Sequence, residues 1–129
     1  MTQYERSGFR DQAFSSWHRP DAGYLNRKCY FADIDWVEYY YESGGQPHPL
    51  AFYELKCKSP NNNEKAEIAT MLAQLCGVLA YLIFYDIGGD GYPETFHVKQ
   101  VFPVEEKGFL TMVRQEMARY IEDVIRKGK

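Results

Sequence analysis

Residues 50–58 read Leu-Ala-Phe-Tyr-Glu-Leu-Lys-Cys-Lys, and they are the part of the chain most informative about its fold. Its apolar and aromatic content predicts a buried strand over Leu50–Lys58. The stretch Cys29–Tyr41 is also rich in aromatic and β-branched residues and predicts a strand before it. Glu42–Pro49, between the two, contains glycines and prolines that are typical of a turn. The two strands are therefore expected to form an antiparallel hairpin.

The residues after this hairpin predict two helices and two further strands. Glu64–Cys76 and Gly108–Lys127 each carry an apolar stripe at helical spacing, and Asn63 is the expected N-cap of the first helix. The stripes consist of Ile68, Met71, Leu72 and Leu75, and of Leu110, Val113, Met117, Tyr120, Ile121 and Val124. The continuous apolar run Leu79–Tyr85 predicts a strand covered on both faces, and Thr95–Phe102 predicts another strand.

The chain before the hairpin predicts one more helix, over Gln3–Trp17, where aromatic residues and alanine recur at loosely helical spacing. The complete order is then α-β-β-α-β-β-α, with no internal repeat and no linker. This order predicts an α/β fold in a single domain of residues 1–129, with a central mixed β-sheet and flanking helices.

Composition limits the class of protein. A chain of 129 residues that is 45% hydrophobic and 16% aromatic can form one compact core and is not of a disordered type. No apolar run approaches the roughly 20 residues that span a bilayer, so we expect a soluble, cytoplasmic protein without a membrane partner. A net charge of −3 argues against non-specific coating of nucleic acid, although local basic faces remain compatible with it. The three cysteines lack the paired spacing of a zinc site.

Four charged residues are expected on one side of the hairpin. Strand alternation places Asp33 and Asp35 on one face, and it places Glu54 and Lys56 together on a face of the next strand. Two carboxylates about 4 Å apart repel by roughly 4 kcal/mol at an effective dielectric constant near 20, and one lysine offsets only part of this. A bound Mg²⁺ or Mn²⁺ ion would relieve the repulsion, because hard cations prefer oxygen ligands. The alternative is a surface hairpin with a solvated, charged face.

The stretches Asp-Ile-Asp-Trp-Val-Glu (33–38) and Leu-Ala-Phe-Tyr-Glu-Leu-Lys (50–56) together resemble the signature of the PD-(D/E)XK, or restriction-endonuclease-like, nuclease superfamily, in particular its small phage-encoded members. The resemblance covers roughly Trp17–Tyr85. Ala32 replaces the proline of the motif. A second Glu-x-Lys match, Glu105–Lys107, shows that the strand context, rather than the tripeptide, gives the motif its meaning.

The resemblance implies a restriction-endonuclease-like fold and Mg²⁺-dependent hydrolysis of DNA. Asp35 and Glu54 would hold the ion, with Asp33 as a further or alternative ligand. Lys56 would orient or deprotonate the attacking water. Gln74 occupies a helix position from which a glutamine often approaches the site in this superfamily, although an exposed helix glutamine is an equal alternative.

Other residues and partners complete the expectation. The candidate contacts to nucleic acid are His18, Arg19 and Lys58. No phosphate-binding glycine loop is present, so no nucleotide cofactor is expected. The last helix forms core or the face of a homodimer, and the compartment is a prokaryotic or phage-infected cytoplasm. The alternative to an endonuclease is a non-catalytic module, a phage-type inhibitor for example, that binds nucleic acid or protein and retains the nuclease fold.

Overall fold

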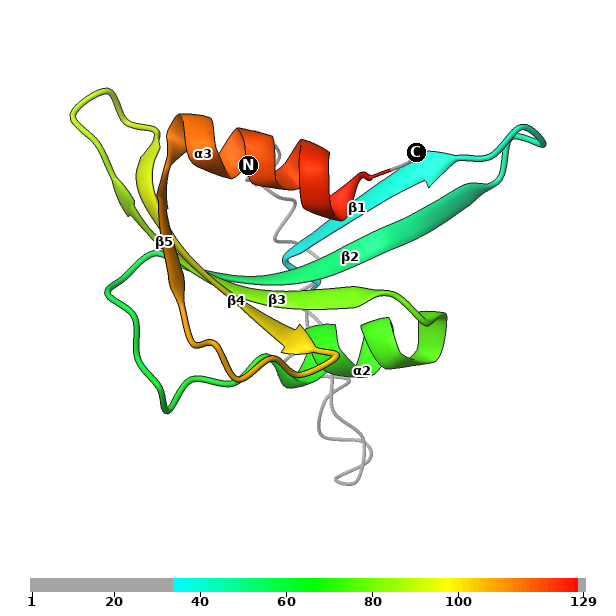
Figure 1. Ribbon diagram of the computed structural model, residues 1–129, viewed down its shortest axis with the longest axis horizontal. Coiled ribbons are helices and arrows are strands. Elements are labelled where there is room, and N and C mark those ends of the chain that lie inside the picture. Colours follow the sequence, from blue (N-terminus) through cyan, green and yellow to red (C-terminus); the bar gives the residue numbers. More distant parts are fainter. Residues whose placement is uncertain (1–33, 128–129) are drawn as a thin grey trace, which may run out of the picture. The chain divides into compact units, whose positions relative to one another are not determined.

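The strand that carries Glu54 and Lys56 lies within a mixed sheet in the computed structural model, which describes residues 34–127 (Figure 1). The strands of these residues are β1 (Trp36–Tyr41), β2 (Pro47–Lys56), β3 (Leu79–Ile87), β4 (Pro93–Phe102) and β5 (Leu110–Val113). Their order in the sheet is β1-β2-β3-β4-β5. β2 is antiparallel to β1 and parallel to β3, and the remaining neighbouring strands are antiparallel to each other. The described residues therefore form a single small α/β domain with a mixed sheet, as the sequence predicts.

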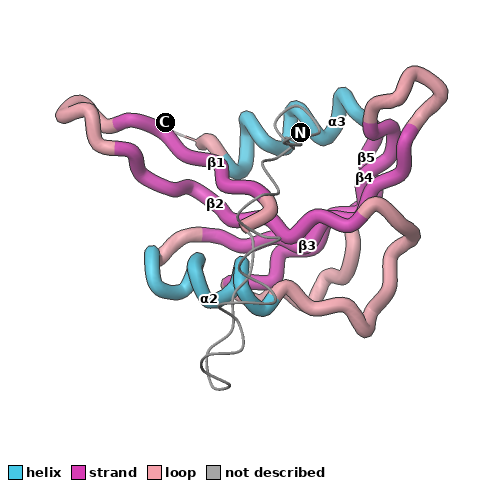
Figure 2. Tube along the Cα trace, turned by 180° about the vertical axis from the view of Figure 1, so that it is seen from behind, coloured by secondary structure: helices cyan, strands magenta, loops and turns pink. Residues whose placement is uncertain are grey.

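Helices cover both faces of this sheet (Figures 1 and 2). α2 (Glu67–Cys76) connects the parallel strands β2 and β3 and packs on one face. α3 (Arg114–Tyr120) continues into the π-helical turn η2 (Ile121–Ile125), and both pack on the other face. The core under α2 consists of Phe52, Ala66, Ala69, Ala73, Ala80, Leu82 and Phe84. The core under α3 consists of Ala51, Tyr53, Tyr81, Ile83, Val98, Met112, Met117 and Ile125.

The helix predicted over Glu64–Cys76 is present but begins later, at Glu67, and Asn63 is not its N-cap. The side chain of Asn61 accepts the backbone N–H of Asn63 at 2.7 Å and folds the preceding loop into its own turn. The buried residues of α2 are alanines, whose small side chains let the helix lie close to the sheet. Leu75, predicted to be buried, is 78% exposed, and Met71 is exposed as well.

The single helix predicted over Gly108–Lys127 is wrong in its first part. Leu110–Val113 form β5, which pairs with β4, and only then does α3 begin. Leu110, Val113 and Val124 of the predicted stripe are exposed, whereas Met117 is buried. The apolar stripe gave a wrong prediction because its residues, although spaced by three and four positions, belong partly to a strand and partly to the helix that follows it. Pairing with β4, a tertiary interaction, decides the first four positions.

The hairpin forms as predicted, with β2 beginning earlier, at Pro47. Proline is tolerated at positions 47 and 49 because β2 pairs with β3 only from Ala51 onward, so a single neighbouring strand borders this segment. Described residues of β1 begin at Trp36; positions 29–33 and the helix predicted over Gln3–Trp17 lie outside the described residues. The order within residues 34–127 is β-β-α-β-β-β-α, which differs from the predicted order by the strand β5. Among the same residues, no helix is long and apolar enough to cross a membrane.

Candidate functional site

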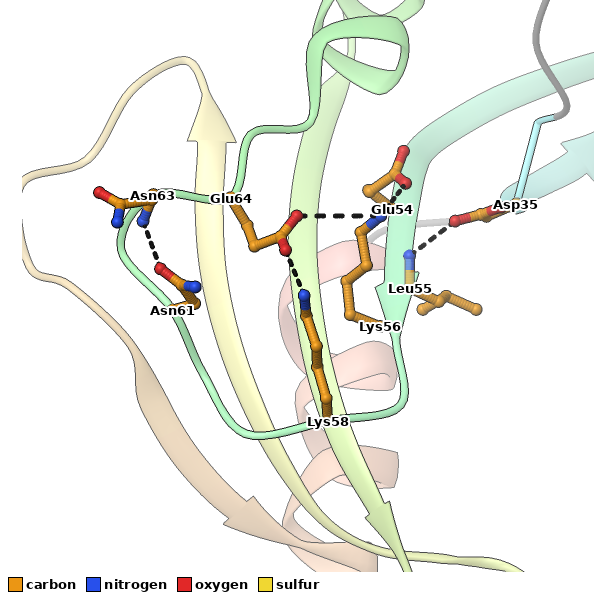
Figure 3. Close-up of polar contacts among 8 residues, drawn as sticks. All are labelled: Asp35, Glu54, Leu55, Lys56, Lys58, Asn61, Asn63 and Glu64. Atoms are coloured by element: carbon orange, nitrogen blue, oxygen red, sulfur yellow. Dashed lines mark hydrogen bonds and ion pairs between the residues drawn. The ribbon is translucent and has the colours of Figure 1, made fainter.

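Glu54 and Lys56 lie at the carboxyl end of β2, on the face that α2 covers. Strand alternation puts them on the same side as Phe52, which belongs to the core under α2. Their side chains are 23% and 31% exposed, so both are partly withdrawn from water. The Lys56 Nζ atom lies 3.2 Å from Oε2 of Glu54 (Figure 3). The two residues of the Glu-x-Lys motif therefore form a direct ion pair.

Asp35 approaches the same end of β2 from the neighbouring strand. It immediately precedes Trp36, which pairs with Tyr53, so its position corresponds to that of Glu54. Its Oδ2 atom accepts the backbone N–H of Leu55 at 2.9 Å (Figure 3). The Asp35 carboxylate thereby satisfies a backbone N–H group of β2 at the point where β1 begins. The structure thus brings Asp35, Glu54 and Lys56 together at one end of the hairpin.

The electrostatics of the three side chains are not balanced. Burial raises the pKa of Glu54 above its ordinary value, and the charge of the neighbouring Asp35 raises it further. The hydrogen bond and the positive charge of Lys56 act in the opposite direction and do not cancel these effects. The Asp35 and Glu54 carboxylates are therefore close enough to repel. A proton or a cation held between them would relieve this repulsion.

A further acid, Glu64, belongs to this cluster, and the sequence interpretation missed its place. It falls within the helix predicted over Glu64–Cys76, but it lies in the loop before α2 and folds back toward β2 (Figure 3). Glu64 forms an ion pair with Lys58, which lowers the pKa of the Glu64 carboxyl group, and its Oε2 atom lies 4.0 Å from Lys56 Nζ. The turn chemistry of Asn61 was the available signal, because an Asn that closes its own turn delays the helix.

The remaining predicted site residues are less closely connected. Lys58, expected to contact nucleic acid, is engaged by Glu64. Gln74 lies in a surface groove of about 490 Å³ that also includes Glu64 and Lys99. No hydrogen bond joins Gln74 to the site in the part of the chain that the structure describes, and its role remains a prediction. Asp33, His18 and Arg19 lie outside the described residues.

The donor set suits a hard cation with few protein ligands. Within residues 34–127, no group of three His, Cys, Asp or Glu side chains is placed to hold a metal ion. Asp35 and Glu54 supply two carboxylates, and Mg²⁺ commonly binds through one or two carboxylates while it keeps water and phosphate in its other positions. Burial first and the charge of Asp35 second raise the pKa of Glu54, so a cation beside this carboxylate would be favourable. The residues therefore fit Mg²⁺ or Mn²⁺ better than a cation that requires a closed protein cage.

No protein-family model, curated protein or solved structure matches this chain significantly. The functional interpretation therefore rests on the arrangement of the described residues and on the chemistry of their side chains.

Proposed function

We propose that this protein is a metal-dependent endonuclease that hydrolyses phosphodiester bonds of DNA at the site formed by Asp35, Glu54 and Lys56. The observation that carries the proposal is the meeting of two repelling carboxylates and one lysine at the end of a buried strand. Carboxylates in excess over a neighbouring lysine are typical of a site that functions with a bound metal ion.

Each residue has a distinct role in this proposal. Asp35 and Glu54 would hold Mg²⁺ or Mn²⁺ through their carboxylate oxygens. The bound ion would offset phosphate charge and lower the pKa of a coordinated water. Lys56 can donate hydrogen bonds to the water or to a phosphate oxygen, since its ammonium already lies at the edge of the site, between Glu54 and Glu64. A phosphate group would compete with both carboxylates for this ammonium.

The fold is compatible with this role. A hairpin with an acid beside Glu-x-Lys, followed by a helix and an apolar strand, is the order on which the resemblance to PD-(D/E)XK nucleases rests, and it supports the proposal. The restriction-endonuclease-like fold, the DNA substrate, a homodimer and a cytoplasmic location belong to the same proposal. Two further residues are supporting candidates: Gln74, which lines the groove that also includes Glu64, and Lys58, which pairs with Glu64.

Plasmid nicking tests the proposal with a control that the sequence itself provides. We expect the full chain to nick supercoiled plasmid with Mg²⁺ or Mn²⁺ and to lose the activity with EDTA. Glu54→Gln and Lys56→Met should each lower the rate by about 100-fold or more, as expected when a metal ligand or a proton-transfer group is removed. The matched variants Glu105→Gln and Lys107→Met alter the second Glu-x-Lys match, an exposed ion pair, and should nick at the wild-type rate.

Equal nicking by all five proteins, wild type included, would overturn the assignment of this site. The specific alternative is a non-catalytic module that binds nucleic acid or protein. The ion pairs of Lys56 with Glu54 and Glu64 favour it, because they neutralise part of the cluster without a metal. Absence of nicking in every metal, together with unchanged amide chemical shifts of Glu54 and its neighbours on addition of Mg²⁺, would favour this alternative.

A further inference from the structure

The Glu64 carboxylate lies between two lysine side chains beside the end of β2 (Figure 3). Its Oε1 atom accepts a hydrogen bond from Lys58, and its Oε2 atom lies 4.0 Å from Lys56 Nζ, so each oxygen faces a different lysine. The hydrogen bond from Lys58 lowers the pKa of the carboxyl group, so Glu64 stays charged near neutral pH. Two cations therefore hold one anion through its two oxygens.

The same position suits a phosphate group. A phosphodiester also carries its negative charge on two oxygens of one central atom, and lysine binds phosphate as a point charge with freely rotating donors. The side chains of Lys58 and Lys56 are 50% and 31% exposed, so an anion from solvent can reach both ammonium groups. The arrangement that holds Glu64 is therefore also one that can hold a phosphate.

The Glu64 side chain can leave the two lysines without any change to α2. It belongs to the loop between β2 and α2, in which residues 57–63 are exposed and the chain is first buried again at Ala66. The backbone N–H of Glu64 donates to the Asn61 carbonyl at 3.2 Å, a bond that fixes the main chain but not the side chain. Glu64 also lines the groove of about 490 Å³ beside Lys99, which gives a rotated carboxylate space in water.

We propose that Lys56 and Lys58 form a subsite for a backbone phosphate of DNA, and that the Glu64 carboxylate occupies this subsite until the phosphate displaces it. The proposal rests on the proposed function for the identity of the ligand, whereas the displacement itself needs no metal ion. The carboxylates of Asp35, Glu54 and Glu64 outnumber the two ammonium groups, so a further anion is repelled while all three remain. Departure of Glu64 frees both the space and the positive charge. Glu64 is thus an internal competitor of the substrate and not a metal ligand.

The test measures the affinity of the full chain for a fluorescein-labelled DNA duplex, about one helical turn long, by fluorescence anisotropy in EDTA. Without a metal ion, no cleavage disturbs the measurement. Glu64→Gln removes the competing charge and keeps the size of the side chain, so it should tighten binding about threefold to fivefold, the contribution of one partly exposed ion pair. The matched control is Glu67→Gln, because Glu67 is exposed and lines the same groove. This control should tighten binding by less than about twofold, since a charge outside the subsite acts only through screened solvent.

A second variant tests whether Glu64 acts through Lys58. Lys58→Met should weaken binding about fivefold and should lower the slope of log affinity against log salt concentration by about 0.9, the value for one lost phosphate contact. Lys107→Met removes a lysine charge at an exposed site and should leave this slope unchanged. In Lys58→Met, the further change Glu64→Gln should alter the affinity by less than about twofold, because the closer ion pair of Glu64 is already absent.

Amide spectra of the ¹⁵N-labelled proteins show whether each variant is folded. Any of three results would overturn the proposal: no gain in affinity with Glu64→Gln, an equal gain with Glu67→Gln, or the full gain in the Lys58→Met background. The nicking assay separates this proposal from the nuclease assignment. The expected binding pattern without nicking in any metal would leave a phosphate subsite but no nuclease, whereas nicking without the binding pattern would leave the nuclease but not the subsite.

Discussion

The two faces of the sheet differ in how their polar groups are paired, although the same strand, β2, contributes a polar residue to each face. On the α2 face, Glu54 has an ion pair with Lys56, and alanines bring the helix close to the strands. On the α3 face, the buried Tyr53 hydroxyl lies beside Glu38 without a well-formed hydrogen bond among the described residues, and a cavity of about 400 Å³, open to solvent, lies between the helix and the sheet. Small helix residues leave little room between layers, whereas the larger side chains and the π-helical turn of the other face do not fill the available space.

The comparison teaches where binding can be expected. A closely packed layer offers a site only at its edge, which is where Asp35, Glu54 and Lys56 meet at the end of β2. The α3 layer instead leaves a cavity of about 400 Å³ that is lined mostly by apolar side chains.

The largest expected effect is on the core, and it compares two adjacent residues of β3. Leu82 and Ile83 are both 2% exposed, but Leu82 packs under α2 and Ile83 borders the cavity. Leu82→Ala should lower the free energy of unfolding by about 4 kcal/mol and Ile83→Ala by about 2 kcal/mol, because side chains next to an existing cavity can relax more easily around the smaller residue. Urea unfolding followed by circular dichroism measures both. If Ile83→Ala is the more costly of the two, the packing difference between the faces is wrong.

The next effect concerns the buried carboxylate of the α3 face. Arg126→Met removes the partner of Glu38 and should lower the free energy of unfolding by roughly 1–2 kcal/mol. The effect is held below that of a fully buried pair because the Arg126 side chain is 46% exposed, so water can replace part of the interaction. The matched control is Glu122→Gln, since Glu122 is the other, exposed partner of Arg126.

This control should change the unfolding free energy by less than about 0.5 kcal/mol, as is usual for an exposed helix pair. Adding Glu38→Gln to Arg126→Met should restore part of the loss, because no charge is then buried without a partner. Equal losses in Arg126→Met and Glu122→Gln would show that Glu38 does not depend on this guanidinium group.

Local patterns in the sequence were sufficient for the elements around the charged site. The alternation of side chains along a strand predicts that Glu54 and Lys56 share a face, and the apolar run at Leu79–Tyr85 predicts the buried strand that lies parallel to β2. The proximity of Asp35, Glu54 and Lys56 depends on these elements alone, and so it could be predicted from the sequence.

The other face could not be predicted in the same way. The strand β5 exists because Leu110–Val113 pair with β4, and no local pattern separates this segment from the helix that follows. The cavity depends on which gaps remain after α3 and η2 pack, so the residues that line it, Tyr53 among them, read from the sequence as ordinary core. Glu64 was missed for a related reason, since its place depends on the path of a loop.

The smallest expected effect is the pH dependence that Glu54 gives to stability. Because the pKa of Glu54 is raised in the folded protein, the folded state binds more protons than the unfolded state above the ordinary Glu value of about 4.3. The free energy of unfolding of the wild type therefore decreases as pH rises from that value through the raised pKa. Glu54→Gln removes this loss, so its stability relative to wild type should increase between about pH 4 and pH 7. Urea midpoints across this range measure the difference.

Lys56→Met and added Mg²⁺ should change the decrease of stability with pH in opposite directions. Lys56 lowers the pKa of Glu54, so its removal should raise that pKa further and make the decrease of stability with pH larger than in wild type. Mg²⁺ bound by the Asp35 and Glu54 carboxylates should favour their charged forms and flatten the same decrease. The pKa values of Asp90 and Glu64 are lowered, so the stability that these two carboxylates contribute is lost as pH falls. Because this loss is the same in wild type and in Glu54→Gln, the difference between the two proteins isolates Glu54. A constant difference between wild type and Glu54→Gln across the range would mean that the two carboxylates do not repel, and the metal site would lose its physical basis.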